Sequence, residues 1–328
     1  MRKEPYLVTG APGWLGTRLV EILCKKKYNV RCLVLKDIDA SELKNLGVKI
    51  VRGDVTDKSS LAEAVNDVDT IIHCAGIIHP RKIKDLFLVN TEGTRNLLKT
   101  AVEAAVKKFI YISSSVAQGT NIEPDVLLRE HDPCNPYMMY GKSKWLAEQV
   151  VRDFHRQDKI KTIIIRPCWY YGIRQPEKQT KLMKMIKKGH PLIFGDGKNL
   201  RNMTYIDNLV DGIILADSTK KAEGETYWIA DERPYTTLEI YETIAEILNV
   251  KIKPIFIPKF ISRMLRLMNS ILDRIGINIM SIRAGGEMSE NIACSIDKAK
   301  KELGYKPKIE LKEGMKKSIE WVVQNNLL

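Results

Sequence analysis

Short apolar runs alternate with stretches of helical periodicity over roughly the first 170 residues of the chain. In the first helical stretch the apolar side chains Leu15, Leu19, Ile22 and Leu23 recur every three or four positions. Strands and helices in alternation are typical of an α/β fold, a doubly wound parallel sheet with helices on both faces. The strands are predicted at Tyr6–Thr9, Val30–Leu35, Val48–Arg52, Thr70–Cys74, Lys108–Ser113 and Lys161–Arg166.

The alternation is lost after Tyr171, which indicates a second, smaller unit. Two later segments, 204–207 and 226–230, again look like parts of the sheet domain. We therefore expect a sheet domain made of residues 1–172 plus about 204–230. A discontinuous lobe would comprise about 173–203 plus 231–328.

One segment of the predicted lobe, residues 258–280, has a broad apolar face at helical spacing. Two interpretations stay open: a helix packed on the core of the lobe, or a basic amphipathic helix that meets a membrane surface or covers a lipid-like substrate. The face is formed by Phe260, Ile261, Met264, Leu265, Leu267, Met268, Ile271, Leu272 and Ile275, and the cations off it are Lys259, Arg263, Arg266 and Arg274.

The composition fits a large globular protein, since 44% of the 328 residues are hydrophobic. The formal net charge of +13 comes from dispersed lysines, several at predicted helix ends. Because no basic tail or RNA-binding aromatic motif occurs, we expect no nucleic-acid partner. Attraction of an anionic cofactor, substrate or membrane is the simpler explanation of the charge.

The six cysteines lack metal-ligand spacing, so no metal site is predicted. Their placement within predicted elements favours reduced thiols in a cytoplasmic protein. The chain has no signal-peptide pattern and no apolar run of the ~18 residues that a spanning helix needs. Membrane association would therefore depend on 258–280.

The motif TGAPGWLG (9–16) links the first strand to the first helix. A helix N-terminus presents free N–H groups and partial positive charge, and glycines let the backbone approach phosphates closely. This position after a first strand predicts dinucleotide binding. The predicted contacts are Gly10, Gly13, Trp14, Leu15 and Gly16.

Tyr140 and Lys144 stand four residues apart, on one face of a predicted helix. An ammonium beside a phenol favours the phenolate and lowers its pKa from about 10 toward neutrality. A tyrosine of this kind can exchange a proton with a substrate oxygen.

Together the glycine motif and the YxxxK pair resemble the extended short-chain dehydrogenase/reductase family. That family includes nucleotide-sugar epimerases and dehydratases, 3β-hydroxysteroid dehydrogenases and dihydroflavonol reductases. The resemblance runs nearly end to end and implies a Rossmann sheet with a substrate-binding lobe. Further matching stretches are GDVTD (53–57), HCAG (73–76), NTEGT (90–94), FIYISSS (109–115), RP (166–167) and YG (171–172).

The resemblance implies hydride transfer between a substrate carbinol carbon and nicotinamide. Tyr140 would be the general acid/base, and Lys144 would lower its pKa and hold the nicotinamide ribose. A serine would polarise the substrate oxygen. In the family this hydroxyl lies five residues before a glycine, so counting back from Gly119 selects Ser114.

The resemblance also implies the remaining cofactor contacts, and the second strand bears on the cofactor's identity. The acidic position that selects NAD falls at Val34, which is apolar, and Lys36 just beyond it is suited to a 2′-phosphate. Asp37 would serve a ribose hydroxyl if the strand ran longer. NADP is therefore favoured over NAD. The expected contacts besides the glycine motif are Lys36, Asp54, Val55, Ala75, Gly76, Asn90, Tyr140, Lys144 and Pro167.

Substrate contacts are expected from Ser115, Trp169 and Arg201, the last against a pyrophosphate as in sugar-nucleotide members. Trp169 stands where epimerases tend to carry asparagine, and Asn208 is typical of steroid-type members. These two residues favour an oxidoreductase that interconverts a secondary alcohol and a ketone on an apolar small molecule.

Two alternatives stay open. One is a nucleotide-sugar epimerase, dehydratase or 4-ketoreductase with bound nicotinamide. The other is a non-catalytic cofactor-sensing protein, although such members usually lack the Tyr/Lys pair. A homodimer is the habit of the family.

Overall fold

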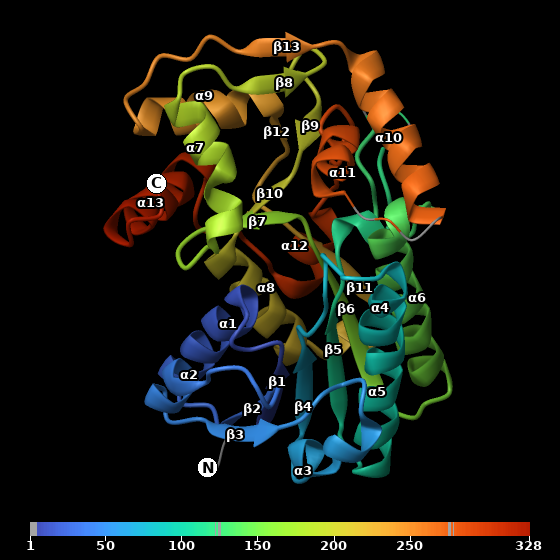
Figure 1. The fold of residues 1–328 in the computed structure, drawn as a ribbon. Coiled ribbons are helices and arrows are strands. Elements are labelled where there is room, and N and C mark those ends of the chain that lie inside the picture. The colour runs from blue at the N-terminus through green and yellow to red at the C-terminus, as the bar shows by residue number, and fades with distance from the viewer. Residues whose placement is uncertain (1–4, 122, 124–125, 275–276, 278) are drawn as a thin grey trace.

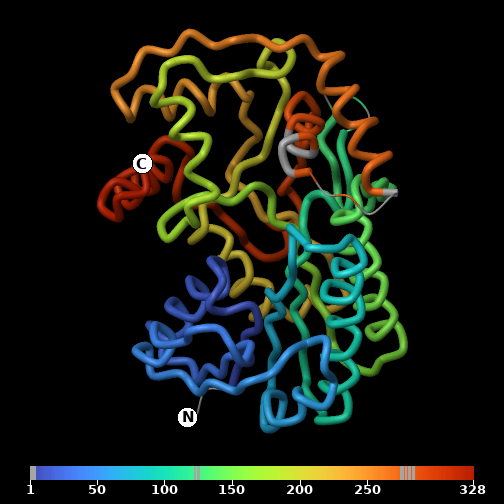
Figure 2. Tube along the Cα trace, in the orientation of Figure 1, coloured from blue at the N-terminus to red at the C-terminus, as the bar shows by residue number. Residues whose placement is uncertain are grey.

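The computed structural model describes residues 5–121, 123, 126–274, 277 and 279–328. Ile275 of the predicted apolar face lies outside the described residues. The sheet with its helices fills the lower half of the molecule and a smaller lobe lies above it (Figure 1). The chain passes between these two parts several times, as the trace in Figure 2 shows.

A seven-stranded parallel sheet forms the larger part, in the order β11-β6-β5-β4-β1-β2-β3. The chain winds outward from β1 to β3, then starts again at β4 on the other side of β1. Ligands of such sheets bind beyond the carboxyl ends of the strands at this reversal. The strands are β1 (Tyr6–Thr9), β2 (Val30–Val34), β3 (Lys49–Arg52), β4 (Thr70–His73), β5 (Lys108–Ile112), β6 (Lys161–Pro167) and β11 (Thr226–Ile229).

Helices cover both faces of this sheet, so its inner strands are apolar on both sides. Successive side chains point to opposite faces: Val8 joins one core and Leu7 the other. The first face packs against α1, α8 and α12, and the second against α3, α5 and α6. Around the sheet the helices are α1 (Trp14–Lys25), α2 (Ser41–Asn45), α3 (Ala62–Val65), α4 (Ile83–Leu86), α5 (Gly93–Glu103), α6 (Met138–Arg156), α8 (Ile206–Ser218) and α12 (Asp297–Leu303).

The lobe has a core of its own, built from α7, α9, α13 and three short strand pairs. At the outer edge, α10 packs on α11. The elements of the lobe and its connections are β7 (Trp169–Tyr171), α7 (Lys181–Lys187), β8 (Leu192–Phe194), β9 (Leu200–Arg201), β10 (Met203–Tyr205), β12 (Tyr235–Thr236), α9 (Thr237–Ile247), β13 (Ile255–Ile257), α10 (Lys259–Arg274), α11 (Met280–Glu287) and α13 (Leu311–Gln324).

The predicted α/β fold is confirmed, and five of the six predicted strands differ from the observed ones by one residue at one end. β2 ends one residue earlier than predicted, because Leu35 is 48% exposed and lies in the following turn. The segment 296–305, which the predicted limits assign to the lobe, packs in the first core of the sheet domain. There the Tyr305 hydroxyl donates to the Ala230 carbonyl at 2.9 Å.

None of the helices in the described part of the chain combines the length and hydrophobicity needed to span a bilayer. The segment 258–280 forms α10 and the start of α11. Its apolar stripe is divided: Met264 and Leu267 are 64% and 65% exposed, whereas Ile261 and Leu265 are half-buried.

Candidate active site

The glycine loop between β1 and α1 has no room for side chains. Gly10 has a φ of +82°, and a Cβ there would lie 2.6 Å from the Ala75 nitrogen. A Cβ at Gly13 or Gly16 would lie 2.6 or 2.5 Å from the Gly10 carbonyl oxygen. No side chain caps α1, which leaves its first N–H groups open to a ligand. A dinucleotide pyrophosphate fits this loop, on which Gly10, Gly13, Trp14, Leu15 and Gly16 all lie.

His73 ends β4 below the loop and is fully buried, which lowers its pKa to about 3. Its Nδ1 lies 2.7 Å from Thr9 Oγ1, and its Nε2 lies 3.0 Å from Thr94 Oγ1. Thr94 donates its proton to the Asn90 carbonyl, so Nε2 must carry the ring proton and Nδ1 accepts from Thr9. Thr9 in turn accepts from the Ala75 N–H at 3.2 Å. His73 is thus a neutral link that fixes the loop after β4.

Asn90 shapes the same loop and is 1% exposed. Its Oδ1 accepts from the Ile77 N–H at 2.8 Å, and its Nδ2 donates to the Ile77 carbonyl and to Ser143 Oγ at 3.0 and 2.9 Å. A Cβ at Gly76 would lie 3.0 Å from Asn90 Oδ1 and 3.9 Å from Lys144 Nζ. Gly76 therefore borders the lysine, and Asn90 acts by positioning this loop.

The ends of β2 and β3 form the other end of the cofactor groove. Arg52, the β3 partner of Val34, donates to two carbonyls of the turn after β2 at 2.7 Å each. Lys36 is exposed in that turn. Asp54 accepts an N–H of its own turn at 2.8 Å, and Val55 is buried beside it. The cations Lys36 and Arg52 thus border the expected place of the adenosine ribose. The position where an NAD enzyme would carry a carboxylate is the apolar Val34.

Tyr140 and Lys144 lie one turn apart near the start of α6. A Cβ at Gly141 would lie 2.5 Å from the Val116 carbonyl oxygen, so this glycine lets α6 touch the loop after β5. Met138, two residues before Tyr140, has a φ of +59°, a backbone conformation that residues other than glycine rarely adopt. Strain of this kind clusters at functional sites.

The Lys144 ammonium is buried at the floor of the site. Nζ donates to the Ile112 carbonyl at 2.7 Å and lies 4.3 Å from the centre of the Tyr111 ring. Burial lowers the pKa of Lys144 to about 7, although the charge of Glu148 acts against this. Hydroxyl or anionic acceptors beside Nζ would favour the ammonium, the form that stabilises a phenolate at Tyr140.

The three serines after β5 differ in their partners. Ser113 donates to Glu148 Oε1 at 2.5 Å and is therefore occupied. Within the described residues the hydroxyls of Ser114 and Ser115 have no hydrogen-bond partner, and Ser114 is the more exposed. The geometry excludes Ser113 and keeps the other two, so the choice of Ser114 stays a prediction.

A buried ion pair lies behind these serines. Arg166 Nε and Nη2 donate to the two carboxylate oxygens of Glu148 at 2.9 and 2.6 Å, and both side chains are about fully buried. Arg166 also donates to Gln118 Oε1 at 2.5 Å. Burial would raise the pKa of Glu148, but Arg166 and Ser113 outweigh it and hold the pKa below its usual value. The pair ties α6 to β5 and to the end of β6, where Pro167, a predicted cofactor contact, lies.

Tyr170 on β7 is a site residue that the sequence did not reveal. Its ring centre lies 4.8 Å from that of Trp14. Burial raises the pKa of the Tyr170 phenol, and the charge of a nearby Tyr140 phenolate raises it further. Its place beside Trp169, in the loop after β6, is a signal that could have identified it. Trp169 itself donates Nε1 to Gln179 at 3.2 Å in the wall of a small apolar pocket of the lobe.

Arg201 is 8% exposed in the lobe. Its Nη2 donates to the Glu287 carbonyl, whereas its Nε is buried with no partner among the described residues. The Tyr241 hydroxyl is likewise buried and unpartnered, and burial raises its pKa to about 12 against the opposing charge of Arg201. Buried guanidinium N–H groups are rarely left unpaired, so this position is suited to an anion.

Asn208 has a structural role. Its Nδ2 donates to the Ile309 carbonyl at 2.8 Å and its Oδ1 accepts from the Lys308 N–H at 3.0 Å. It is buried and fastens α8 to the segment before α13. Asn208 therefore makes no contact that bears on the substrate class, and its likeness to steroid-type members stays a prediction.

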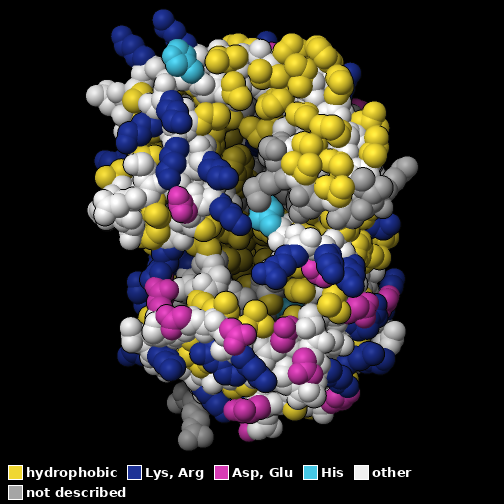
Figure 3. All heavy atoms as spheres, viewed as in Figure 1, with side chains coloured by type: hydrophobic (Ala, Val, Ile, Leu, Met, Phe, Trp, Pro, Cys, Tyr) yellow, Lys and Arg dark blue, Asp and Glu magenta, His cyan; other side chains and the backbone are white. Residues whose placement is uncertain are grey.

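Figure 3 shows the molecule hollowed between the sheet domain and the lobe. The doubly wound sheet, the open helix N-terminus and the Tyr140–Lys144 pair define a nicotinamide-dependent enzyme of the extended short-chain dehydrogenase/reductase type. Residues 7–258 match the model of the 3-beta hydroxysteroid dehydrogenase/isomerase family. The chain belongs to that family.

Relatives with different named reactions are similar to this chain. The 3 beta-hydroxysteroid dehydrogenase/Delta 5-->4-isomerase of Mycobacterium tuberculosis is 33% identical over 73% of this chain and 68% of its own length. The N-acetyl-alpha-D-glucosaminyl-diphospho-ditrans,octacis-undecaprenol 4-epimerase of Escherichia coli O157:H7 is 31% identical over 78% of this chain and 76% of its own length.

A solved structure shares the fold. The UDP-glucuronic acid 4-epimerase of Bacillus cereus, solved in complex with UDP-glucuronic acid and NAD, superposes with a TM-score of 0.78. It is 24% identical over 98% of this chain and 99% of that chain.

Proposed function

We propose that this enzyme epimerises a sugar carried on a diphosphate, by oxidising and re-reducing one carbinol carbon. The observation that carries the proposal is Arg201, a buried guanidinium with an unpaired Nε in the lobe. Where substrate binding opens this buried atom to the site, a charge-assisted hydrogen bond from its N–H to a phosphate oxygen would satisfy it. The relative from Escherichia coli, whose name describes a sugar diphosphate, supports the same substrate class.

The chain's own residues supply proton transfer and orientation. Tyr140 as phenolate takes the proton of the carbinol hydroxyl and returns it when the ketone is reduced. Lys144, held at the Ile112 carbonyl, keeps the phenolate stable. The Ser114 hydroxyl donates to the reacting oxygen. The nicotinamide, when bound, accepts the hydride and returns it.

A second candidate is a dehydrogenase that acts on an apolar alcohol such as a steroid. One observation favours it: residues 7–258 match the model of the 3-beta hydroxysteroid dehydrogenase/isomerase family. A dehydrogenase releases reduced nicotinamide in every cycle, whereas an epimerase regenerates its oxidised cofactor. Net formation of reduced cofactor therefore separates the two.

The substitution Arg201→Gln tests the diphosphate. It should raise KM for a UDP-hexose about 10- to 100-fold with little change in kcat, because a hydrogen bond from a charged group is lost. Product analysis should show the epimer without accumulation of reduced nicotinamide. Arg233→Gln, which alters an exposed arginine of the same lobe paired with Glu239, is the control. Turnover of a hydroxysteroid but of no sugar diphosphate, unchanged in Arg201→Gln, would overturn the proposal.

NADP is the cofactor that we propose, on the two cations at the ends of β2 and β3. The variant Lys36→Ala should weaken NADPH binding about tenfold and leave NADH binding unchanged, since Lys36 has no partner in the described structure and only the 2′-phosphate would meet it, whereas Arg52 also holds the turn after β2. Fluorescence titration with both nucleotides measures this. Lys44→Ala, at an exposed lysine of α2, is the control. Equal weakening of both nucleotides would argue against NADP selection at this place.

A further inference from the structure

The helix α10 turns its apolar side away from the protein. Phe260, Met264, Leu267 and Ile271 recur at helical spacing and are 59%, 64%, 65% and 54% exposed. An ordinary surface helix has the reverse arrangement, with its apolar stripe on the core and its polar face in solvent.

The side of α10 that faces the protein is closely packed and carries buried polar residues together with the half-buried Ile261 and Leu265. Ser262 is fully buried and donates to the Gly285 carbonyl at 2.7 Å, and Asn269 is 3% exposed. A Cβ at Gly286 would lie 3.0 Å from the Arg266 nitrogen, so the glycines of α11 let the two helices approach closely. α10 is therefore held through these polar side chains and Leu265, an arrangement that keeps Met264 and Leu267 outward.

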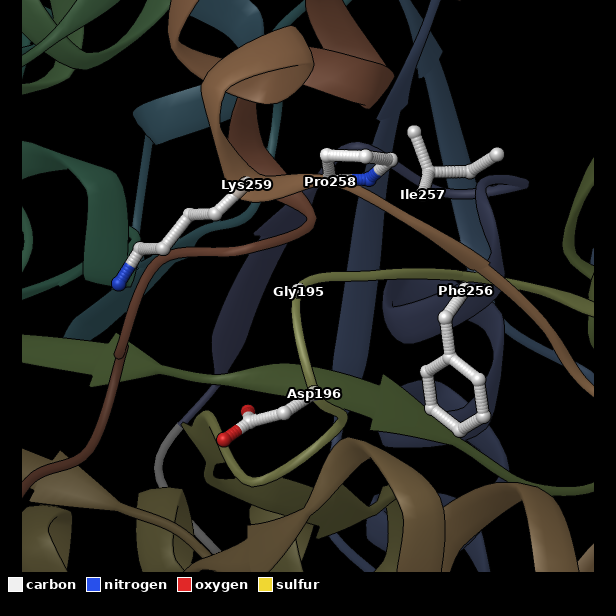
Figure 4. Close-up of a pocket in the computed structure, with 6 residues that line it drawn as sticks. All are labelled: Gly195, Asp196, Phe256, Ile257, Pro258 and Lys259. Carbon is white, nitrogen blue, oxygen red and sulfur yellow. The ribbon is translucent and has the colours of Figure 1, made fainter.

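The exposed apolar surface continues beyond α10. On the paired strands β8 and β13, Leu192, Ile255 and Phe256 are 41%, 48% and 52% exposed. Figure 3 shows apolar side chains gathered at the top of the molecule, over β13 and α10. Where β13 meets α10, a pocket of about 480 Å³ lies beside Phe256 and Lys259 (Figure 4). From here on, the term apolar face means the exposed residues Leu192, Ile255, Phe256, Phe260, Met264, Leu267 and Ile271.

Cations flank the apolar face. Arg266 of α10 pairs with Glu290 at 3.3 Å, whereas six exposed cations around the face form no ion pair with a described residue, and the chain carries a formal net charge of +13. These six are Lys187, Lys188, Lys251, Lys253, Lys259 and Arg263.

We propose that the apolar face docks on the surface of a membrane that contains anionic phospholipids. Apolar side chains enter the boundary between headgroups and acyl chains, and flanking lysines and arginines meet the phosphates. A second copy of this chain is the poorer occupant, because it would bring two cationic rims together.

The substrate class follows if the proposed function holds. α10 packs on α11, and the carbonyl of Glu287 at the end of α11 accepts from Arg201. The docking face and the proposed diphosphate site are thus joined through one helix. The sugar diphosphate would then be one attached to a membrane lipid.

Vesicle flotation tests the docking. The full chain should bind vesicles of phosphatidylglycerol and phosphatidylcholine, bind less at high salt, and bind pure phosphatidylcholine weakly. Met264→Glu/Leu267→Glu should lower the affinity about a hundredfold, since two carboxylates replace two buried apolar side chains. The control Val126→Glu/Val323→Glu alters two side chains, each 54% exposed, outside the face and should bind like the parent.

Separate readouts distinguish the failure of each idea. Docking is overturned if the parent binds neither kind of vesicle, or if Met264→Glu/Leu267→Glu binds vesicles like the parent. It is also overturned if light scattering shows that the parent is a dimer and that this variant is a monomer. The lipid-linked substrate is supported if the variant turns over a vesicle-borne polyprenyl-diphosphate sugar at least about tenfold more slowly but a UDP-hexose at the parent's rate. Equal rates on the vesicle-borne sugar overturn it. Vesicle binding without turnover of either sugar refutes the proposed function and leaves the docking standing.

Discussion

Replacing Tyr140 with phenylalanine should lower turnover about 1,000-fold and leave nicotinamide binding intact. In the proposed mechanism the phenol exchanges a proton with the substrate oxygen, and proton transfer by a positioned side chain contributes about 10²- to 10⁴-fold. The ring that phenylalanine keeps preserves the packing near Tyr170. Steady-state turnover gives the loss, and titration with reduced nicotinamide gives the cofactor affinity.

Tyr28→Phe is the control for this substitution. The ring centres of Tyr28 and Tyr6 lie 5.1 Å apart in an edge-to-face contact. Because Tyr6 is the first residue of β1, Tyr28 lies at the amino ends of the strands, away from the site. It should turn over substrate like the parent. Turnover in Tyr140→Phe within a factor of about ten of the parent would contradict the assigned proton transfer.

Breaking the buried ion pair should have the largest effect on stability. Glu148→Met or Arg166→Met alone should lower the free energy of unfolding by about 3–5 kcal/mol, because each leaves a buried charge without its partner. The double variant should cost much less than the sum of the two, since no charge is left unpaired. Urea unfolding followed by circular dichroism measures all three.

A surface ion pair gives the comparison for that cycle. Lys58 and Glu103 lie 2.6 Å apart but are 45% and 60% exposed, so Glu103→Met should cost no more than about 1 kcal/mol. Additive losses in the Glu148 and Arg166 variants would show that the two side chains are not coupled. The interpretation of this network as the support of the serine loop and α6 would then fail.

The parts of the site that short sequence patterns predict are the parts built from local structure. The glycine loop and the Tyr140–Lys144 spacing each lie within one turn or one helix, where spacing fixes geometry. The strands were identified for the same reason, since each is a short apolar run between turn residues. The fold follows from their order because parallel strands joined by helices have few ways to pack.

What the sequence leaves open depends on contacts between distant segments. Tyr170 meets Trp14 only because β7 folds back over the glycine loop. The three adjacent serines are alike in type, and the position of Glu148 on α6 decides which one is occupied. The spacing in 258–280 predicted an apolar stripe, but the side on which it lies depends on the glycines of α11.

The proposed docking depends on α10, which lies outside the residues of the family match. The family match ends at residue 258, and α10 begins at the next residue. Because α10 is held through Ser262, Asn269 and the glycines of α11, its outward positions are free to change type without loss of folding. Substitutions on this one helix would then alter the proposed membrane docking and leave the fold of the sheet domain unchanged.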